Sequence, residues 1–389
     1  MLFLRAAALL AAVVVLCGSV LLAMEAPLGS PITATAPPGT YACCYGAMPE
    51  HPAIVCCLRI QGTVLDFTQN HGRDRRIYSR AIGDKRDLYV YLPPGYCPDK
   101  QYPLMIVLHG ILQDERAFLD WVVKPLDDAI VAGKVPPLIV AAPDGSFTGD
   151  PNPWDAGSFF INGPRGNYQS WIEDDLWFFL LRNFSIRPEP EAHVMAGASM
   201  GGVGAFNIGL RHPERFRHLI RLMPALNLRW LDRHENYLAP FDPNNWGWRN
   251  RVNNPQEVIG QFGPLKIHMK DILIPAFGRG NAAILLASEN NPIEIIDRYQ
   301  VKPGQFHMLI TIAGRDNFNL DAQAHSFIYL AQHRGFTIDT YTLPRGTHDI
   351  GTAQKMIPIV FDWLGTALAP YHPSAEHDTL GQATIRFTP

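Results

Sequence analysis

The chain has 389 residues, of which 47% are hydrophobic and 18% charged, and its formal net charge at pH 7 is −3. This is the composition of an ordinary globular protein, long enough to bury a large core as one large domain or two small ones. The charge balance excludes the strongly basic character that favours nucleic acid or an anionic membrane surface, so we expect neither partner.

The first 26 residues predict a signal peptide or an N-terminal anchor. One early cation, Arg5, precedes an uncharged apolar run from Ala6 to Met24, which is the pattern of an export signal. The run is also about as long as a membrane-spanning helix, roughly 17–25 residues, so an uncleaved anchor is the alternative to cleavage. We expect a secreted, periplasmic or cell-envelope protein that contacts a membrane only through such an anchor.

Residues 27–57 are predicted to form a linker and a cysteine-rich segment. The first part, 27–40, is rich in Pro, Thr and Gly and lacks apolar periodicity, which favours a linker. In an oxidising environment we expect a disulfide between one member of each cysteine pair, Cys43 or Cys44 with Cys56 or Cys57. Adjacent cysteines suit zinc less well than C-x-x-C, so no metal is expected. Cys97 is left over.

Residues 58–368 are predicted to form one α/β domain. An antiparallel pair of strands comes first, at 58–67 and 87–96. Short apolar runs ended by turn residues then alternate with helical patterns, which implies a parallel, doubly wound sheet. The later strands are expected at 103–110, 137–145, 192–198, 218–226, 307–314 and 336–344, and helices at 114–134, 170–184, after Ser199, and at 320–334 and 351–365.

One segment, 225–305, is too long for an ordinary crossover between strands. We interpret it as a lid-like insertion that covers the strand ends. It contains four large aromatic residues interleaved with Asn, Pro and Gly, namely Trp230, Tyr237, Trp246 and Trp248. Their density predicts that Trp246 and Trp248 line an aromatic acyl or sugar subsite; the alternative is that these rings pack the insertion onto the sheet. Residues 369–389 are a C-terminal tail without evident structure.

The stretch AHVMAGASMGGVGAF at 192–206 contains G-x-S-x-G, with Ser199 between Gly197 and Gly201. This pattern is typical of a nucleophile elbow, in which a strand turns sharply into a helix and lifts the serine off the sheet edge. The expected strand before Ser199 and helix after it supply the context that the motif requires. Ser199 is therefore the predicted nucleophile.

A serine hydroxyl needs an adjacent base, and the base needs a third group to orient it. In α/β-hydrolases the acid and then the histidine follow the serine, each on a loop after a later strand. Among the histidines beyond Ser199, His348 is the one that directly follows the last strand and precedes the last helix. Asp316 follows the penultimate strand and is the predicted acid. Asp321 opens a helical pattern, so we assign it to helix N-capping instead.

The oxyanion of a tetrahedral intermediate needs two backbone N–H donors. One is expected from Met200, the residue after the nucleophile, and the other from the loop after the strand 103–110. We assign the second donor to Ile111, with Leu112 as the alternative. His109 precedes this loop and is expected to brace it through a hydrogen bond rather than to act in catalysis.

These motifs resemble the esterase D and feruloyl-esterase branch of the α/β-hydrolases, which also includes secreted mycolyltransferases. The matching residues are LHG at 108–110, SFFINGPRGNYQSWIEDDL at 158–176, GASMGG at 197–202, AGRD at 313–316 and TH at 347–348. The resemblance implies an α/β-hydrolase fold with a Ser-His-Asp triad. Members of the branch act on feruloyl and acetyl esters of polysaccharides, on S-formylglutathione and on acyl-trehalose lipids. The long WGWR-containing insertion matches none of these closely.

The sequence therefore predicts a secreted serine esterase that hydrolyses carboxylic esters, with acyl or feruloyl esters of carbohydrates as candidate substrates. Two alternatives remain: an acyltransferase that uses the same acyl-enzyme, and a non-catalytic binding protein on a hydrolase scaffold. The sequence contains neither H-E-x-x-H nor G-x-x-x-x-G-K-[ST], so we expect no metal and no other cofactor.

Overall fold

A computed structural model describes residues 53–55, 59–149, 156–252 and 254–373. The predicted signal or anchor at 1–26, the linker, the two cysteine pairs and the tail beyond residue 373 lie outside these residues, so those expectations stay predictions. Over the described ranges, the chain contains no helix that combines the length and the apolar character needed to cross a membrane.

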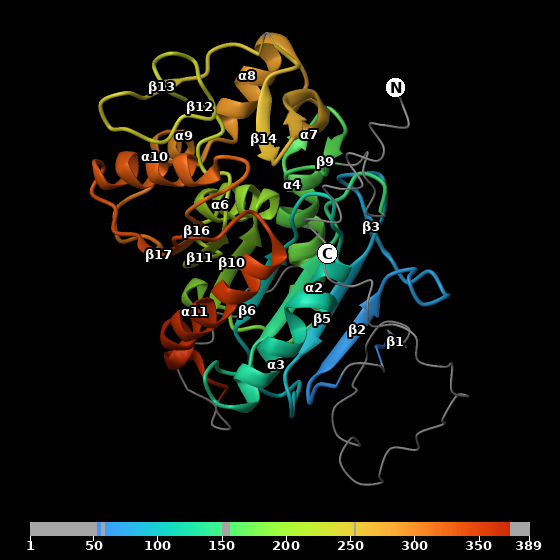
Figure 1. Ribbon diagram of the computed structural model, residues 1–389. Helices are drawn as coiled ribbons and strands as arrows, with labels where there is room; N and C mark the ends of the chain where they lie inside the picture. The colour runs from blue at the N-terminus through green and yellow to red at the C-terminus, as the bar shows by residue number, and fades with distance from the viewer. Residues whose placement is uncertain (1–52, 56–58, 150–155, 253, 374–389) are drawn as a thin grey trace.

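The fold is built on a nine-stranded sheet with the order β1-β2-β5-β7-β6-β10-β11-β16-β17 (Figure 1). The first three strands in this order pair antiparallel, and the strands from β7 to β17 are parallel. This confirms the predicted early antiparallel pair and the mostly parallel sheet. The strands are β1 Ala53–Ile54, β2 Thr63–Phe67, β5 Leu88–Leu92, β6 Leu104–Leu108, β7 Ile139–Pro143, β10 His193–Ala198, β11 His218–Leu222, β16 His307–Ala313 and β17 Asp339–Leu343.

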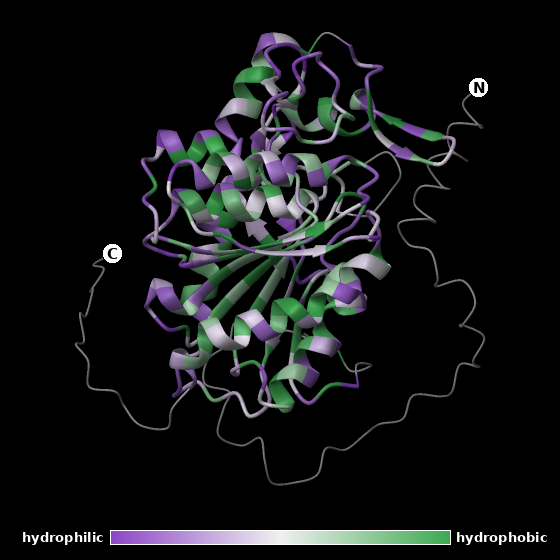
Figure 2. Cartoon of the chain, turned by 60° about the vertical axis from the view of Figure 1, so that its left-hand side comes forward, coloured by the Kyte–Doolittle hydropathy of each residue, from purple (hydrophilic) through white to green (hydrophobic). Residues whose placement is uncertain are grey.

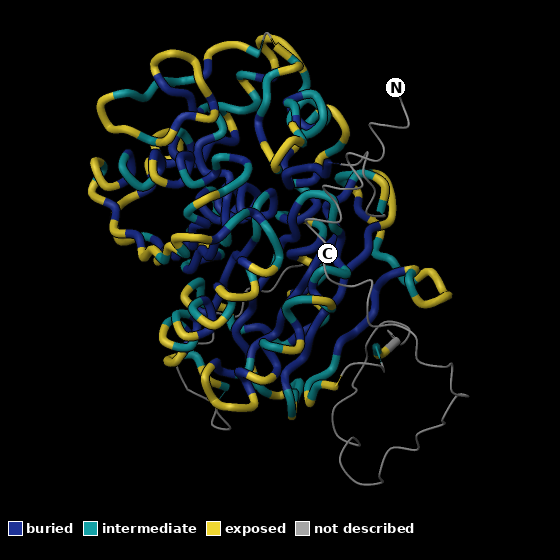
Figure 3. The backbone as a smooth tube through the Cα atoms, in the orientation of Figure 1, coloured by how far each residue is buried: buried dark blue, intermediate teal, exposed yellow. Residues whose placement is uncertain are grey.

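Helices cover both faces of the sheet, as the buried, near-continuous apolar strands require. One face carries α2, α3 and α11, and the other carries α5, α6 and α10. Figure 2 shows the sheet between these two layers, and Figure 3 shows that its central strands are buried. The helices are α2 Arg116–Trp121, α3 Val123–Val131, α5 Trp177–Asn183, α6 Met200–Arg211, α10 Leu320–Gln332 and α11 Ile350–Leu368.

Alternate residues of the central strands supply two separate hydrophobic cores. In β6, Ile106 and Leu108 face the core that contains Phe206 of α6, whereas Met105 faces the core that contains Phe361 of α11. A period of two along a strand produces this division. Smaller elements complete the periphery: β3 Ile77–Ser79, β4 Asp84–Arg86, β8 Asn162–Gly163, β9 Gly166–Asn167, α4 Tyr168–Ser170, a π-helical turn at Trp171–Leu176, and 3-10 turns at Pro190–Ala192 and Ala369–Tyr371.

The predicted insertion lies between β11 and β16 and occupies the top of Figure 1, beyond the carboxyl ends of the parallel strands. It holds two small hairpins and three helices. These are β12 Trp230–Leu231 with β13 Gly247–Trp248, β14 Val258–Phe262 with β15 Leu265–His268, and α7 Met269–Phe277, α8 Gly280–Glu289 and α9 Pro292–Arg298. The insertion therefore places its side chains above the edge of the sheet at which Ser199 lies.

Candidate active site

Ser199 occupies a sharp turn between β10 and α6. Its backbone has φ 51° and ψ −116°, a left-handed conformation that a residue with a side chain adopts only when its surroundings impose it. The flanking glycines make the turn possible. A Cβ on Gly197 would lie 2.2 Å from the carbonyl oxygen of Gly201, and a Cβ on Gly201 would lie 2.1 Å from that of Leu108. The G-x-S-x-G spacing therefore reflects backbone contacts that leave no room for a side chain.

The structure brings the three predicted residues together. The Nε2 atom of His348 lies 2.9 Å from Ser199 Oγ, and its Nδ1 lies 2.7 Å from Asp316 Oδ2. The side chains of His348 and Asp316 are only 4% and 1% exposed, so water competes little with these hydrogen bonds. Asp316 follows β16 and His348 follows β17. Carboxyl ends of parallel strands meet at one edge of a sheet, which explains how residues so distant in sequence converge.

The two loops that carry the acid and the histidine hold each other in place. The Asp316 Oδ1 atom accepts a hydrogen bond from the amide of Phe318 at 2.8 Å, so this carboxylate is fixed at both oxygens. The amide of His348 donates to Asn317 Oδ1 at 3.0 Å, and the Phe318 ring meets the imidazole edge-on at 5.1 Å. No sequence motif indicates a role for Asn317; the one signal for it is its place beside the predicted acid.

Asp321 lies in the first turn of α10, where the N-cap is Asn319 rather than Asp321. The predicted N-capping role of Asp321 is therefore wrong, because the N-cap lies two residues before it. Burial, followed by the negative charge of Asp316, raises the pKa of Asp321. Asp321 Oδ1 has no hydrogen-bond partner among the described residues, and the carboxylate bonded to His348 is that of Asp316.

The loop after β6 is held by its own side chains. The amide of Gly110 donates to Gln113 Oε1 at 2.9 Å. His109 donates from Nδ1 to the carbonyl of Gly110 at 2.8 Å and accepts at Nε2 from the amide of Gly145 at 2.8 Å, which matches the bracing role expected of it. Ile111 and Met200 both line the pocket at Ser199. Met200 is the first residue of α6, so its N–H has no acceptor within the helix; the two donors stay a prediction.

An apolar pocket extends from Ser199 beneath the insertion, and we name it the insertion pocket. It holds about 860 Å³ of empty space, part of it open to solvent. Most of its wall comes from aliphatic and aromatic side chains of α7 and α8 and their neighbours, including Met269, Ile272, Leu273, Phe277, Ala283 and Ala287. Two of its polar side chains are engaged: Tyr237 Oη donates to the Phe318 carbonyl at 2.8 Å, and Arg249 is paired with Glu257 at 2.6 Å. A third, Gln323, donates from Nε2 to Tyr237 Oη, but its Oε1 has no partner among the described residues. Burial raises the pKa of Tyr237.

The structure does not bring Trp246 and Trp248 to Ser199. Neither ring lines the insertion pocket, even though the pocket reaches Ser199 and much of the insertion. The two rings contact each other at 5.6 Å, and the guanidinium of Arg229 lies 5.4 Å from the Trp248 ring. Both rings pack against the core from the outside. Their arrangement fits the packing alternative, and the aromatic subsite gains no support from it.

A second pocket opens at Ser199 on the side of the imidazole, and we name it the His348 pocket. It holds about 550 Å³ and is lined by the loop after β6 and by the start of α11, with Gly110, Gln113, Ser199, Met223, His348 and Ile350 among its residues. Ser199 therefore stands between two pockets, of which only the second includes the imidazole among its lining residues. Within the described ranges, no group of three or more His, Cys, Asp or Glu side chains is arranged to hold a metal ion.

Comparisons with known proteins point to esterases. Residues 79–271 match a family model described as "Putative esterase". An endo-1,4-beta-xylanase/feruloyl esterase of Xylanibacter ruminicola is 30% identical over 159 residues, which are 38% of this chain and 21% of that protein. An S-formylglutathione hydrolase of Rattus norvegicus is 28% identical over 180 residues, 42% of this chain and 61% of that protein. The chain thus spans less than two thirds of either relative.

The solved structure of a ferulic acid esterase is similar to this chain, with a TM-score of 0.57 at 17% identity. The match covers 79% of this chain and 99% of that one. The chain therefore has the fold of this ferulic acid esterase, and just under half of its residues match the esterase family model.

Proposed function

We propose that the protein hydrolyses carboxylic esters through a covalent acyl-enzyme formed on Ser199. The observation that carries this proposal is the buried hydrogen-bond chain from Asp316 through His348 to a serine on a strained elbow. Asp316 holds the imidazole with its proton on Nδ1, which leaves Nε2 free to accept the serine proton. His348 is thus the general base, and Ser199 the nucleophile.

The reaction has two halves with the same machinery. Ser199 Oγ attacks the ester carbonyl while His348 takes its proton, and the amides of Ile111 and Met200 donate to the oxyanion. The bond to the alcohol oxygen then breaks, and the imidazolium returns the proton to that oxygen, so an alcohol leaves. Water, deprotonated by His348, attacks the acyl-enzyme in the second half, and the carboxylic acid departs as Ser199 regains its proton.

The two pockets at Ser199 support one direction of ester binding. The leaving oxygen must lie near His348, because the imidazolium protonates it. The alcohol therefore points into the His348 pocket, and the acyl group points the other way, into the insertion pocket. That pocket is mainly aliphatic and aromatic, so it favours an apolar acyl group. A feruloyl group of a carbohydrate ester and a plain alkyl chain both meet this requirement.

Hydrolysis of p-nitrophenyl butyrate by wild type and Ser199→Ala tests the proposal. Loss of the nucleophile lowers kcat on the order of a million-fold in such triads, so we expect no detectable turnover by a variant that retains the wild-type circular dichroism and Tm. Ser170→Ala serves as the control. The Ser170 hydroxyl, at the end of α4, accepts a hydrogen bond from the exposed Asn162, so its loss should leave turnover unchanged. Equal activity of wild type and Ser199→Ala would contradict the proposal.

A further inference from the structure

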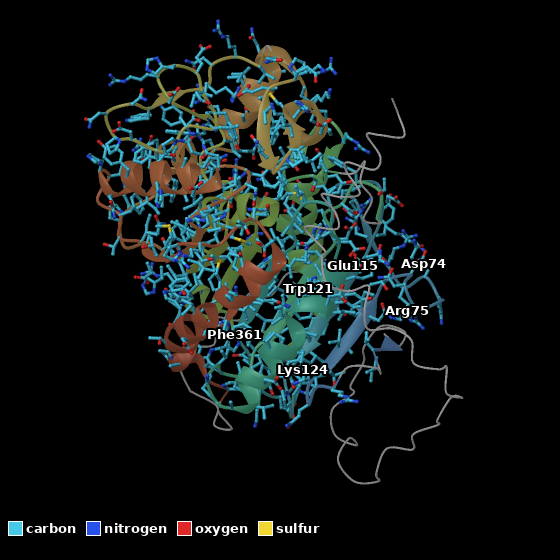
Figure 4. All side chains as sticks on the ribbon, viewed as in Figure 1. Asp74, Arg75, Glu115, Trp121, Lys124 and Phe361 are labelled. Atoms are coloured by element: carbon cyan, nitrogen blue, oxygen red, sulfur yellow. The ribbon has the colours of Figure 1, made fainter. Side chains whose placement is uncertain are left out.

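A third cavity lies on the other face of the sheet, between α2 and α11, and we name it the α2–α11 cavity. It holds about 930 Å³ of empty space, part of it open to solvent. Figure 4 labels Glu115 and Trp121 at α2 and Phe361 on α11, which all contribute to its wall. The reaction described above does not use this cavity.

The α2–α11 cavity adjoins the His348 pocket. The two spaces share four lining residues, Gln113, Ala198, Ile350 and Ala353. Two of these belong to the first turn of α11, and Gln113 ends the loop that carries the proposed oxyanion donor Ile111. The common wall is therefore the strip of side chains between this loop and the start of α11, directly beside Ser199.

The wall of the cavity is chemically suited to an alkyl chain. Its larger part consists of aliphatic and aromatic residues, such as Val107, Phe118, Trp121, Ile357, Val360 and Phe361. The carboxylate of Asp114 is paired with Arg116 at 2.6 Å. Burial, followed by the negative charges of Asp114 and Asp144, raises the pKa of Glu115 to about 9, so this carboxyl is uncharged at neutral pH. The polar side chains of the wall lie toward its Glu115 end, where Glu115 Oε2 has no hydrogen-bond partner among the described residues.

We propose that the α2–α11 cavity receives an apolar chain on the alcohol side of the ester, so that the preferred substrates are esters of long alkyl alcohols. The inference rests on the proposed function, because the alcohol lies on the His348 side only if Ser199 and His348 act as described. The carbon–oxygen bond that breaks then releases an alkyl alcohol whose chain already lies along the α2–α11 cavity. A short alcohol fills the His348 pocket alone.

Two ester series and two matched variants test this assignment. One series varies the alcohol, from ethyl to octyl butyrate, and the other varies the acyl group, from p-nitrophenyl acetate to octanoate. Ala117→Phe on α2 fills the α2–α11 cavity, and Ala287→Phe on α8 fills the insertion pocket; both alanines are partly exposed lining residues. Each methylene that leaves water is worth up to about fourfold in kcat/KM.

For the wild type we expect kcat/KM to be at least tenfold higher for octyl than for ethyl butyrate. Ala117→Phe should reduce the octyl-to-ethyl ratio of kcat/KM to about one and preserve the octanoate-to-acetate ratio. Ala287→Phe should reduce the octanoate-to-acetate ratio and preserve the octyl-to-ethyl ratio. Ala117→Leu provides a milder filling if the larger variant unfolds. Equal values for octyl and ethyl butyrate in the wild type would overturn the inference, and so would a loss in the acyl series caused by Ala117→Phe.

A binding measurement separates this inference from the proposed function. The probe is 11-bromo-1-undecanol, because its bromine quenches the fluorescence of a nearby tryptophan and Trp121 lines the cavity. We expect saturable quenching in Ser199→Ala protein, with at least tenfold weaker binding after Ala117→Phe and little quenching after Trp121→Phe. Absence of quenching overturns the cavity assignment even if the ester is hydrolysed. Quenching without hydrolysis supports the cavity as an alkyl-alcohol site while the proposed function fails.

Discussion

Replacing Asp316 by asparagine tests the orientation of the imidazole without changing its surroundings. Both oxygens of the native carboxylate accept hydrogen bonds, Oδ1 from the Phe318 amide and Oδ2 from His348. An amide side chain has one acceptor oxygen and one NH₂ donor. Because the Phe318 amide can only donate, the amide oxygen must stay on that side, and the NH₂ must face His348 Nδ1.

This arrangement reverses the tautomer of the imidazole. Nδ1 must accept from the new NH₂, so the single proton of neutral imidazole moves to Nε2, which faces Ser199 Oγ. A protonated Nε2 cannot accept the serine proton. A triad with the wrong tautomer loses about ten-thousandfold in kcat, which corresponds to about 5 kcal/mol of transition-state stabilisation. We expect this loss in Asp316→Asn, with the KM for p-nitrophenyl butyrate changed by less than about threefold.

The matched control is Asp321→Asn. This carboxyl lies five residues further along the chain, in the first turn of α10, and is not the one bonded to His348. Initial-rate kinetics of both variants, with Tm measured alongside, should show a severe loss for Asp316→Asn alone. Retention of more than a tenth of the wild-type kcat by Asp316→Asn, or an equal loss in Asp321→Asn, would show that Asp316 does not set the tautomer of His348.

Three further predictions concern stability, each measured by urea unfolding. Gly201→Ala should lower the free energy of unfolding by at least about 3 kcal/mol, because the new Cβ would lie 2.1 Å from a backbone oxygen. Gly202→Ala should lower it clearly less, because its Cβ would lie 3.0 Å from a proline side chain. Equal losses in the two variants would contradict this. The pKa of Glu115 is raised to about 9, so between about pH 5 and 9 the folded state retains a proton that the unfolded state loses. The free energy of unfolding of the wild type should therefore fall relative to that of Glu115→Gln as the pH rises over this range. Free energies of unfolding that change in parallel with pH in the two proteins would contradict this. Arg221→Met should stabilise by about 1–4 kcal/mol because this buried guanidinium has no hydrogen-bond partner among the described residues, and a destabilised variant would show that the charge is compensated.

The sheet and the proposed catalytic residues could be predicted because their signals are local. Buried strands such as β6 and β10 appear as short apolar runs, and a parallel sheet gathers the residues that follow its strands at one edge. Asp316 and His348 could therefore be found from their place after β16 and β17. The turn at Ser199 could be predicted from its glycines, because close backbone contacts exclude side chains at Gly197 and Gly201.

The pockets could not be predicted, because they depend on tertiary contacts of the insertion. Nothing in the pattern of α7 distinguishes residues that line a pocket from residues of an ordinary core, and Pro275 within this helix obscures its period. Aromatic density drew attention to Trp246 and Trp248, although their rings pack against each other and the core. The role of Asn317 depends on a hydrogen bond to His348, 31 residues away in the chain.

Active-site labelling shows directly whether Ser199 is a nucleophile activated by His348. The folded wild type is treated with a fluorophosphonate, and the adduct is located by mass spectrometry of the intact protein and its peptides. We predict one adduct per chain, on Ser199, with none in Ser199→Ala and labelling at least a hundredfold slower in His348→Ala. A folded wild type that does not react, or an adduct that forms at the same rate without Ser199, would show that Ser199 is not an activated nucleophile.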